Sequence, residues 1–279
     1  MKTCDLHLHS IASDGTLTPT EVVDLAISKG LSAIVLTDHN NIHGLKEFSN
    51  AAEGRIEYLG GCEFSTERDG KELHLIAMGI KEEYYDEIEK FMAKQLKIKE
   101  ESNRKIFENL KKDGYKVDYD EMVEMFGGTS VINRGNISNY LAAKKIVDNP
   151  QYAFSVLLNN NGKYYVPWKR VDFQECIDFI HSIGAVAVWA HPLFHVDMPK
   201  CEEILKTTKG LDGIEVYYTT YSDEQQKFAN KMARKYHLLK SGGSDFHGDT
   251  KPDTQIGIGY GNLVIPYSCY KKIAAKLKK

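Results

Sequence analysis

Short apolar runs alternate with longer amphipathic runs over the first and last thirds of the chain. Apolar runs of four to eight residues are typical of buried strands, and periodic runs of ten or more are typical of helices. Strands are predicted at residues 4–10, 32–37, 56–64, 185–189, 213–217, 238–241 and 263–265, with helices at 19–29, 43–53, 171–182, 200–209 and 222–236. This alternation predicts βα units that form a parallel sheet or a barrel.

Two local signals place the boundaries of elements. Thr18-Pro19-Thr20-Glu21 combines a capping box with proline at the first helical position, which predicts a helix start. Arg68-Asp69-Gly70 is a turn between two extended runs, so residues 63–79 are expected to form a hairpin. Pairing across this turn puts Glu63 and His74 on one face, directly opposite or diagonally adjacent.

The βα rhythm is lost between residues 82 and 166, where the pattern is helical. Helices are predicted at 85–112, 119–125, 135–147 and 150–158. We therefore expect a barrel domain made of residues 1–81 and 167–279, with an inserted helical subdomain, 82–166, as a lid or substrate wall. Mixed lysine and glutamate on the first of these helices favour a solvated face over a nucleic-acid surface.

Composition narrows the class of protein. The 279 residues are 42% hydrophobic and 27% charged with a net charge of −3, which is typical of a globular protein without a general attraction to polyanions. Five scattered cysteines without C-x-x-C spacing argue against a disulfide framework and favour the reducing cytoplasm. We see no signal peptide and no apolar run near the roughly 18 residues that a membrane span needs.

Metal-capable side chains recur at the ends of the predicted strands. His7 and His9 alternate with apolar residues, so both imidazoles face the same way and form a chelate. The others are Asp14, His39, Glu63, His74, His191, Asp245 and His247. Loops that follow barrel strands all lie at one face, so these residues are expected to converge. Nitrogen and oxygen ligands without thiolate suit zinc, manganese or iron in a multinuclear hydrolytic site, and Glu63 is the natural bridge.

Each ligand taken singly has another interpretation. His39 beside Asp38 fits a hydrogen-bonded core pair, His191 fits a packing residue at a strand end, and Asp245 fits a turn former. His195, four residues after His191 on the same loop, fits equally well as a residue of the site and as a residue outside it. The histidines on predicted helices are expected to lie outside the site: His43, His181 and His237.

Together these motifs resemble the PHP (polymerase and histidinol phosphatase) family. The matching segments are His7-Leu8-His9 with Asp14, Thr37-Asp38-His39-Asn40, Glu63, His74, Ala190-His191-Pro192 and Gly243-Ser244-Asp245-Phe246-His247. More narrowly, the chain is similar to stand-alone bacterial PHP phosphoesterases, which hydrolyse nucleotides such as 3′,5′-bisphosphates and, in some members, RNA from its 5′ end. The resemblance implies an α/β fold, a distorted (β/α)7 barrel.

The resemblance also implies three divalent metal ions. Carried over by position, the ligand sets are His7, His9, Glu63 and Asp245 for one ion, Glu63, His74 and His191 for a second, and Asp14, His39 and His247 for a third. Some relatives have histidine where this chain has Asp14, which leaves the identity of the third metal open. A hydroxide bridging two metals is the expected nucleophile.

Three further residues are predicted to act on the substrate or the ligands. Arg134, at the start of a helix and matching an arginine of the similar enzymes, is expected to anchor phosphate, with a surface salt bridge as the alternative. His195 is expected to bind phosphate or donate a proton to the leaving oxygen. Asp38 is expected to orient a ligand histidine.

The sequence thus favours a phosphomonoesterase acting on a small nucleotide. Alternatives are an exonuclease that trims short RNA or DNA ends, a metal-binding module without activity, and C–N hydrolysis as in amidohydrolase barrels. Aromatic residues after one strand would stack a base or pack the insertion: Tyr217, Tyr218 and Tyr221. The oligomeric state is left open.

Overall fold

The computed structural model describes residues 2–128 and 132–278, and the chain forms two compact units. The first unit is Met1–Tyr85 with Arg170–Lys279, and the second is Asp86–Lys169. None of the described helices has both the length and the apolarity that a membrane crossing requires. The lid or wall role of the inserted segment stays a prediction.

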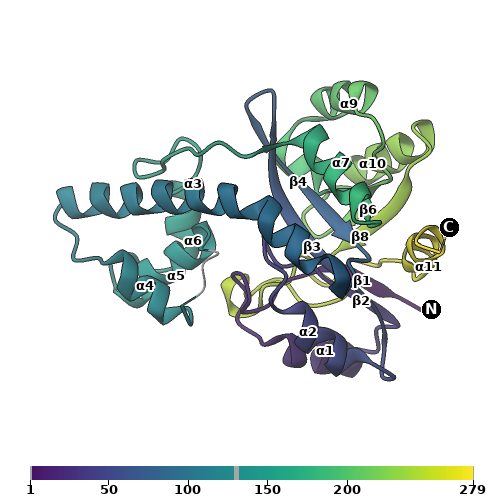
Figure 1. Cartoon of the computed structure of the whole chain (residues 1–279), viewed down its shortest axis with the longest axis horizontal. Helices are drawn as coiled ribbons and strands as arrows, with labels where there is room; N and C mark the ends of the chain where they lie inside the picture. The colour runs from purple at the N-terminus through teal and green to yellow at the C-terminus, as the bar shows by residue number, and fades with distance from the viewer. Residues whose placement is uncertain (1, 129–131, 279) are drawn as a thin grey trace. The chain divides into compact units, whose positions relative to one another are not determined.

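The first unit is built on an eight-stranded sheet (Figure 1). Its strands are β1 Cys4–Leu8, β2 Ala33–Leu36, β3 Glu57–Arg68, β4 Lys71–Met78, β5 Val171–Asp172, β6 Val186–Ala190, β7 Gly213–Tyr218 and β8 Leu239–Gly243. Seven pair in the order β1-β2-β3-β4-β6-β7-β8, and β5 pairs with β3. β4 is antiparallel to both of its neighbours, whereas the other pairs on this path are parallel. The sheet nearly closes, which confirms the predicted distorted barrel.

Helices lie around the outside of this sheet (Figure 1). They are α1 Pro19–Ser28, α2 Leu45–Ala52, α7 Phe173–Ser182, α8 Pro192–His195, α9 Met198–Thr207, α10 Asp223–Lys235 and α11 Ser268–Lys276, with the short turns η1 Glu82–Tyr84 and η3 Gly248–Thr250. The predicted capping box is confirmed, because the Thr18 hydroxyl accepts from the backbone N–H of Glu21, and the Glu21 carboxylate accepts from that of Thr18.

The second unit is helical. It contains α3 Tyr85–Lys112, which begins at the last residue of the first unit, α4 Tyr119–Met125, α5 Arg134–Ala143, α6 Pro150–Tyr152 and a π-helical turn, η2 Ala153–Leu157. Its apolar core is formed by side chains such as Phe107, Met122, Tyr140 and Leu141. The periodicity thus predicts the helical nature of this unit, but not the widened turn.

Buried Asp5 joins the two edges of the barrel. Its carboxylate accepts hydrogen bonds from the backbone N–H and hydroxyl of Ser244 at 2.9 and 2.6 Å, and from the backbone N–H of Gly257 at 2.7 Å. Burial raises the pKa of Asp5 to about 6, although these donors favour the charged form. Asp245 follows Ser244 in the chain, and its backbone N–H donates to the carbonyl of His7 at 3.0 Å. The strand that carries His7 is therefore held beside the loop that carries Asp245.

The β3–β4 hairpin confirms one of the two predicted registers. Ser65 lies opposite His74, and Glu63 lies opposite Ile76. Glu63 is two residues before Ser65 on the same face, so Glu63 and His74 are diagonal neighbours.

Two predicted elements are wrong. Residues 263–265 form no strand. An isolated bridge pairs Thr3 with Pro266, and two backbone hydrogen bonds flank it, from Cys4 N–H to the carbonyl of Ile265 at 3.1 Å and from Tyr267 N–H to the carbonyl of Lys2 at 3.2 Å. Proline has no N–H to donate, so Pro266 itself adds no bond to this short pairing. The helix predicted at 135–147 ends at Ala143, where Lys145 takes the left-handed conformation (φ 56°) and the N–H of Ile146 bonds to Leu141. This is a Schellman ending without glycine, so the sequence does not signal it.

Gly243 provides a test of barrel closure. A Cβ at this position would overlap the Cβ of His7 and lie 2.8 Å from the Cα and backbone nitrogen of His7. We expect Gly243→Ala to lower the free energy of unfolding by at least about 2 kcal/mol, because backbone must move. Urea unfolding measures this. The control is Gly30→Ala, whose added Cβ has no neighbour within 4 Å and whose positive φ alone should cost about 1 kcal/mol. Equal losses would contradict the closure argument.

Candidate metal centre

The nine predicted ligands come together at one end of the barrel, on or just after its strands. Each belongs to at least one group of side chains whose ligand atoms lie within 4.8 Å of one another. The groups are His9-Asp14-His39-His247, His7-Glu63-His191, His7-His9-Asp245, His39-Glu63-His74 and His74-His191-His195. All nine side chains are buried except His39, which is 16% exposed. Sequence reasoning thus identified residues that the fold does bring together.

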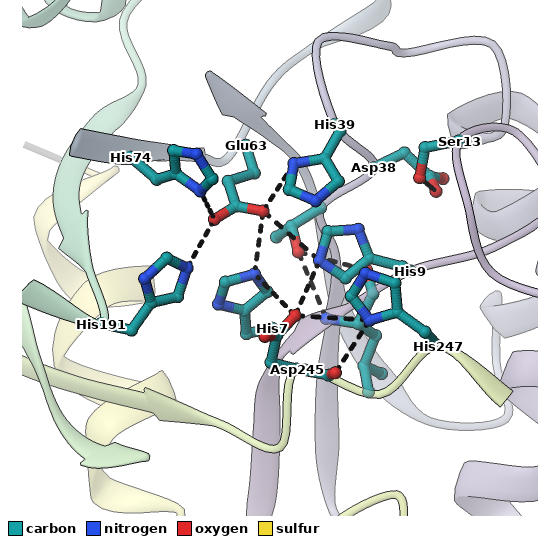
Figure 2. Close-up of polar contacts among 12 residues, drawn as sticks. His7, His9, Ser13, Asp38, His39, Glu63, His74, His191, Asp245 and His247 are labelled. Atoms are coloured by element: carbon teal, nitrogen blue, oxygen red, sulfur yellow. Dashed lines mark hydrogen bonds and ion pairs between the residues drawn. The ribbon is translucent and has the colours of Figure 1, made fainter. Parts of the chain in front are cut away.

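Glu63 lies at the centre of the cluster (Figure 2). Its Oε1 is 2.8 Å from His74 Nδ1 and 2.8 Å from His191 Nε2. Its Oε2 is 2.9 Å from His39 Nδ1, 3.2 Å from His7 Nε2 and 3.4 Å from His9 Nε2. Because the two oxygens face different histidines, this carboxylate has the geometry of a bridge between neighbouring cation positions.

Asp245 and Asp14 complete the other side of the cluster. Asp245 Oδ1 lies 3.2 Å from His9 Nε2 and 3.4 Å from His247 Nδ1. Asp14 Oδ1 lies 3.2 Å from His247 Nε2 and 4.0 Å from His39 Nε2. The rings of His9 and His247 stack with centroids 4.0 Å apart, so the two groups of ligands are continuous.

The chemistry of these side chains fits bound cations. Among the described residues, several buried polar atoms of the cluster make no hydrogen bond: His7 Nε2, both ring nitrogens of His9, Asp14 Oδ1 and Glu63 Oε2. Unpaired buried polar atoms are costly, and a metal ion would satisfy them. Burial alone would raise the pKa of Glu63, but His39, His7 and His74 hold it well below its usual value. Burial, with His247 and His39 nearby, lowers the pKa of His9, which keeps that imidazole neutral as a ligand must be.

Glu215 orients two of the ligand residues. This fully buried side chain lies on β7; its Oε1 is 3.1 Å from His7 Nδ1, and its Oε2 accepts from the backbone N–H of His191 at 2.6 Å. A carboxylate on Nδ1 leaves Nε2 of His7 available as a metal ligand. We did not single out Glu215 from the sequence. Its signal was a lone acid inside an apolar strand, which is rarely buried without a partner.

A second carboxylate contacts His74. Glu72 Oε1 lies 3.4 Å from His74 Nε2, and Glu72 Oε2 pairs with the buried guanidinium of Arg170 at 2.8 Å. Glu63 and Glu72 therefore lie at opposite nitrogens of one imidazole. Burial alone would lower the pKa of His74, but the charge of Glu63 and the hydrogen bonds to both glutamates raise it to about 9.

Asp38 does not orient a ligand histidine, contrary to the prediction. Its Oδ1 accepts from the backbone N–H of Ser10 at 2.8 Å and from the Ser13 hydroxyl at 2.6 Å, and its Oδ2 accepts from the Ser10 hydroxyl at 2.7 Å. Figure 2 shows Asp38 directed at Ser13, away from the imidazoles. Both oxygens are used by the loop that leads to Asp14, so Asp38 shapes that loop.

The structure places His195 beside two predicted ligands. Its ring centroid is 4.7 Å from that of His74 and 5.1 Å from that of His191. Its Nε2 is buried and makes no hydrogen bond to any described residue. Its role stays a prediction, but its place at the cluster is clear.

Arg134 is the first residue of α5, in the second compact unit, whose placement relative to the cluster is not described. Its Nη1 donates to Asn160 Oδ1 at 3.1 Å, and its guanidinium lies 5.4 Å from the ring centroids of both Phe154 and Tyr165. Its role as a phosphate anchor stays a prediction.

The tyrosines at the end of β7 and just after it have structural partners that the sequence did not reveal. The Tyr218 hydroxyl donates to Asp245 Oδ2 at 2.7 Å, and Lys251 Nζ lies 2.6 Å from the same oxygen. The Tyr221 hydroxyl accepts from the backbone N–H of Leu193, and Tyr217 packs against the apolar core. Stacking of a base by these tyrosines stays a prediction.

Known proteins are similar to this chain over most of its length. A family model described as PHP domain matches residues 5–165. A 5′-3′ exoribonuclease of Haemophilus influenzae is 30% identical, covering 88% of this chain and 90% of the relative. A 3′,5′-nucleoside bisphosphate phosphatase of Chromobacterium violaceum is 31% identical, covering 92% of this chain and 91% of the relative. A solved structure of an amidohydrolase from Chromobacterium violaceum, with bound sulfate and no metal, has a TM-score of 0.87 at 26% identity and covers 98% of this chain and 96% of that one.

Glu215 is expected to support metal binding. We expect Glu215→Gln to weaken the affinity for divalent metal about 10- to 100-fold, because the ring of His7 loses its charged partner. The matched control is Asp212→Asn, since Asp212 also accepts from a histidine ring (His181, 2.9 Å) and a backbone N–H (Ala187, 2.9 Å), but outside the cluster. Metal titration and thermal unfolding of both variants separate metal loss from instability. Equal metal affinities would contradict the role of Glu215.

The raised pKa of His74 predicts how metal affinity depends on pH. With its pKa raised to about 9, the free imidazole holds a proton at neutral pH that a metal ion must displace. The apparent affinity should therefore rise as pH increases from 7 to 9, by up to about tenfold per unit for each proton displaced. Calorimetry in buffers of different ionisation enthalpy measures the released protons. The His181→Ala variant is the control and should release the same number of protons as the unaltered protein. If metal binding to the unaltered protein released no protons at pH 7.5, the prediction would be wrong.

Proposed function

This chain belongs to the PHP domain family and is a hydrolase of phosphate esters, and on that premise we propose that it removes phosphate from small nucleotides. The proposed substrate is a phosphate monoester such as a nucleoside 3′,5′-bisphosphate or monophosphate. The observation that carries the proposal is the buried Glu63 carboxylate, which lies within 3.4 Å of nitrogens from five histidines. Such a cluster is suited to cations and through them to phosphate.

Three divalent ions are proposed, held by the sets implied by the resemblance. The groupings that support these sets are His7-His9-Asp245 for the first ion, His74 and His191 facing Glu63 Oε1 for the second, and His9-Asp14-His39-His247 for the third. The absence of thiolate from every set favours zinc, manganese or iron. The grouping of His9 with the third set adds a ligand that position alone did not assign.

The ions would lower the pKa of water and neutralise charge on phosphoryl oxygens. The chain itself contributes position and exclusion of solvent. Glu215 and Glu72 hold the rings of His7 and His74, and the buried cluster keeps bulk water away. Burial, then His74 and His191, hold the pKa of His195 well below its usual value. A neutral His195 suits a hydrogen bond to phosphate better than proton donation, and Arg134 is proposed as a second phosphate contact.

Exonuclease activity on short RNA or DNA ends is the second candidate. The 30% identical relative named as a 5′-3′ exoribonuclease favours it. The same metal centre would serve both activities, so the geometry of the cluster does not choose between them.

A substrate panel tests the proposal. The purified protein, with metal content measured by mass spectrometry, is assayed for phosphate release from nucleoside monophosphates, 3′,5′-bisphosphates and histidinol phosphate, and for shortening of 5′-phosphorylated oligonucleotides. We expect release from nucleotides, abolished by a chelator and restored by zinc, manganese or iron. Shortening of oligonucleotides with no release from small nucleotides would favour the exonuclease. No turnover of any compound by the metal-loaded protein would contradict both.

The Glu63→Gln variant tests the proposed role of Glu63 as a bridge between cations. We expect it to lower activity by at least about 100-fold, because an amide has one oxygen and no charge with which to hold two cations. Glu67→Gln, four residues along the same strand, is the control and should retain activity. Retained activity in Glu63→Gln would reject the proposed bridge.

A further inference from the structure

Lys251 places an ammonium group at the edge of the metal-ligand cluster. Its Nζ lies 2.6 Å from Asp245 Oδ2, and its side chain is 38% exposed, whereas the side chain of Asp245 is 8% exposed. Lys251 therefore connects a buried predicted ligand to solvent. Sequence reasoning did not single it out, since a lysine in a polar loop carries no signal of its own.

The position of Lys251 is set by its loop. The backbone N–H of Asp249 donates to the Thr16 hydroxyl at 2.9 Å, and the Thr250 hydroxyl donates to the backbone carbonyl of Asp14 at 2.9 Å. The backbone N–H of Lys251 bonds to the carbonyl of Gly248 at 3.1 Å, and Gly248 takes a positive φ of 64°. The loop after His247 is thus tied to the loop that carries Asp14. The ammonium group emerges at a defined place beside the cluster.

The two oxygens of Asp245 have separate partners. Oδ1 faces His9 and His247, at 3.2 and 3.4 Å, which is the side of the predicted ligands. Oδ2 accepts from the Tyr218 hydroxyl at 2.7 Å as well as from Lys251. Tyr218 is buried and neutral, so it can hold the carboxylate in place without Lys251. The position of Asp245 therefore does not depend on the lysine alone.

We propose that Lys251 binds the phosphate of the substrate, exchanging Asp245 Oδ2 for a phosphoryl oxygen. A phosphate dianion attracts the ammonium group more strongly than one carboxylate whose charge is shared with a cation. The flexible four-carbon stem of lysine allows the exchange without movement of the backbone. This inference rests on the proposed function, because it assumes a phosphorylated substrate at the cluster.

Lys251→Met and Lys251→Arg test this, with Lys276→Met as the matched control. Lys276 also pairs with a buried aspartate, Asp212, at 2.8 Å, but outside the cluster. The probes are inorganic phosphate, titrated calorimetrically into the metal-loaded protein, and adenosine 3′,5′-bisphosphate as substrate. We expect Lys251→Met to weaken phosphate binding and raise KM by about tenfold or more, with a smaller change in kcat. Lys251→Arg should recover most of the loss, and Lys276→Met should show none.

The metal content of the Lys251→Met variant shows whether Lys251 binds substrate or only neutralises the charge of Asp245. If Lys251 binds phosphate, Lys251→Met keeps the metal content and melting temperature of the unaltered protein. Unchanged phosphate affinity, or a loss of phosphate affinity that follows a loss of metal, would overturn the proposal. Phosphate binding needs no turnover. Lysine-dependent binding in a protein that hydrolyses nothing in the panel would support Lys251 and reject the proposed function.

Discussion

The barrel unit depends on one costly constraint, which is the burial of many polar side chains around Glu63. A buried carboxylate is strongly unfavourable unless cations or donors surround it. Here five imidazoles from four strands or their ends face its two oxygens. Burial lowers the pKa values of His9 and His191, and the neighbouring imidazoles lower them further. The donor set of this cluster therefore fits bound cations.

Closure of the barrel between its first and last strands brings these buried polar side chains together. Asp5 accepts from Ser244 and Gly257, and Gly243 lets the backbone of β8 approach His7. These contacts hold ligands from the first and last strands against one another, although they are more than 230 residues apart in the chain. Two acids outside the predicted ligand sets, Glu215 and Glu72, contact the rings of His7 and His74. Closure and ligand orientation are therefore parts of one network.

Much of the fold follows from local pattern. Most strands and helices of the barrel, the capping box at Thr18 and the diagonal pairing of Glu63 with His74 were predictable, because each depends on residues close together in the chain. The two wrong elements share a cause. Residues 263–265 have strand-like composition but belong to a pairing with a single bridge, Thr3 with Pro266, and α5 ends on a left-handed lysine that its sequence does not mark. Both outcomes depend on neighbours distant in sequence or on unusual backbone geometry.

The amino-acid sequence by itself determined the ligand types and their convergence, since side chains at the ends of parallel strands must meet at one edge of a barrel. Only the tertiary structure decided their partners. It assigned Asp38 to Ser10 and Ser13 instead of a histidine, and it brought Glu215 to His7. Hydrogen bonds form over about 3 Å, whereas sequence pattern locates a residue only to a strand end or a loop. Which neighbour a side chain reaches is therefore settled by packing.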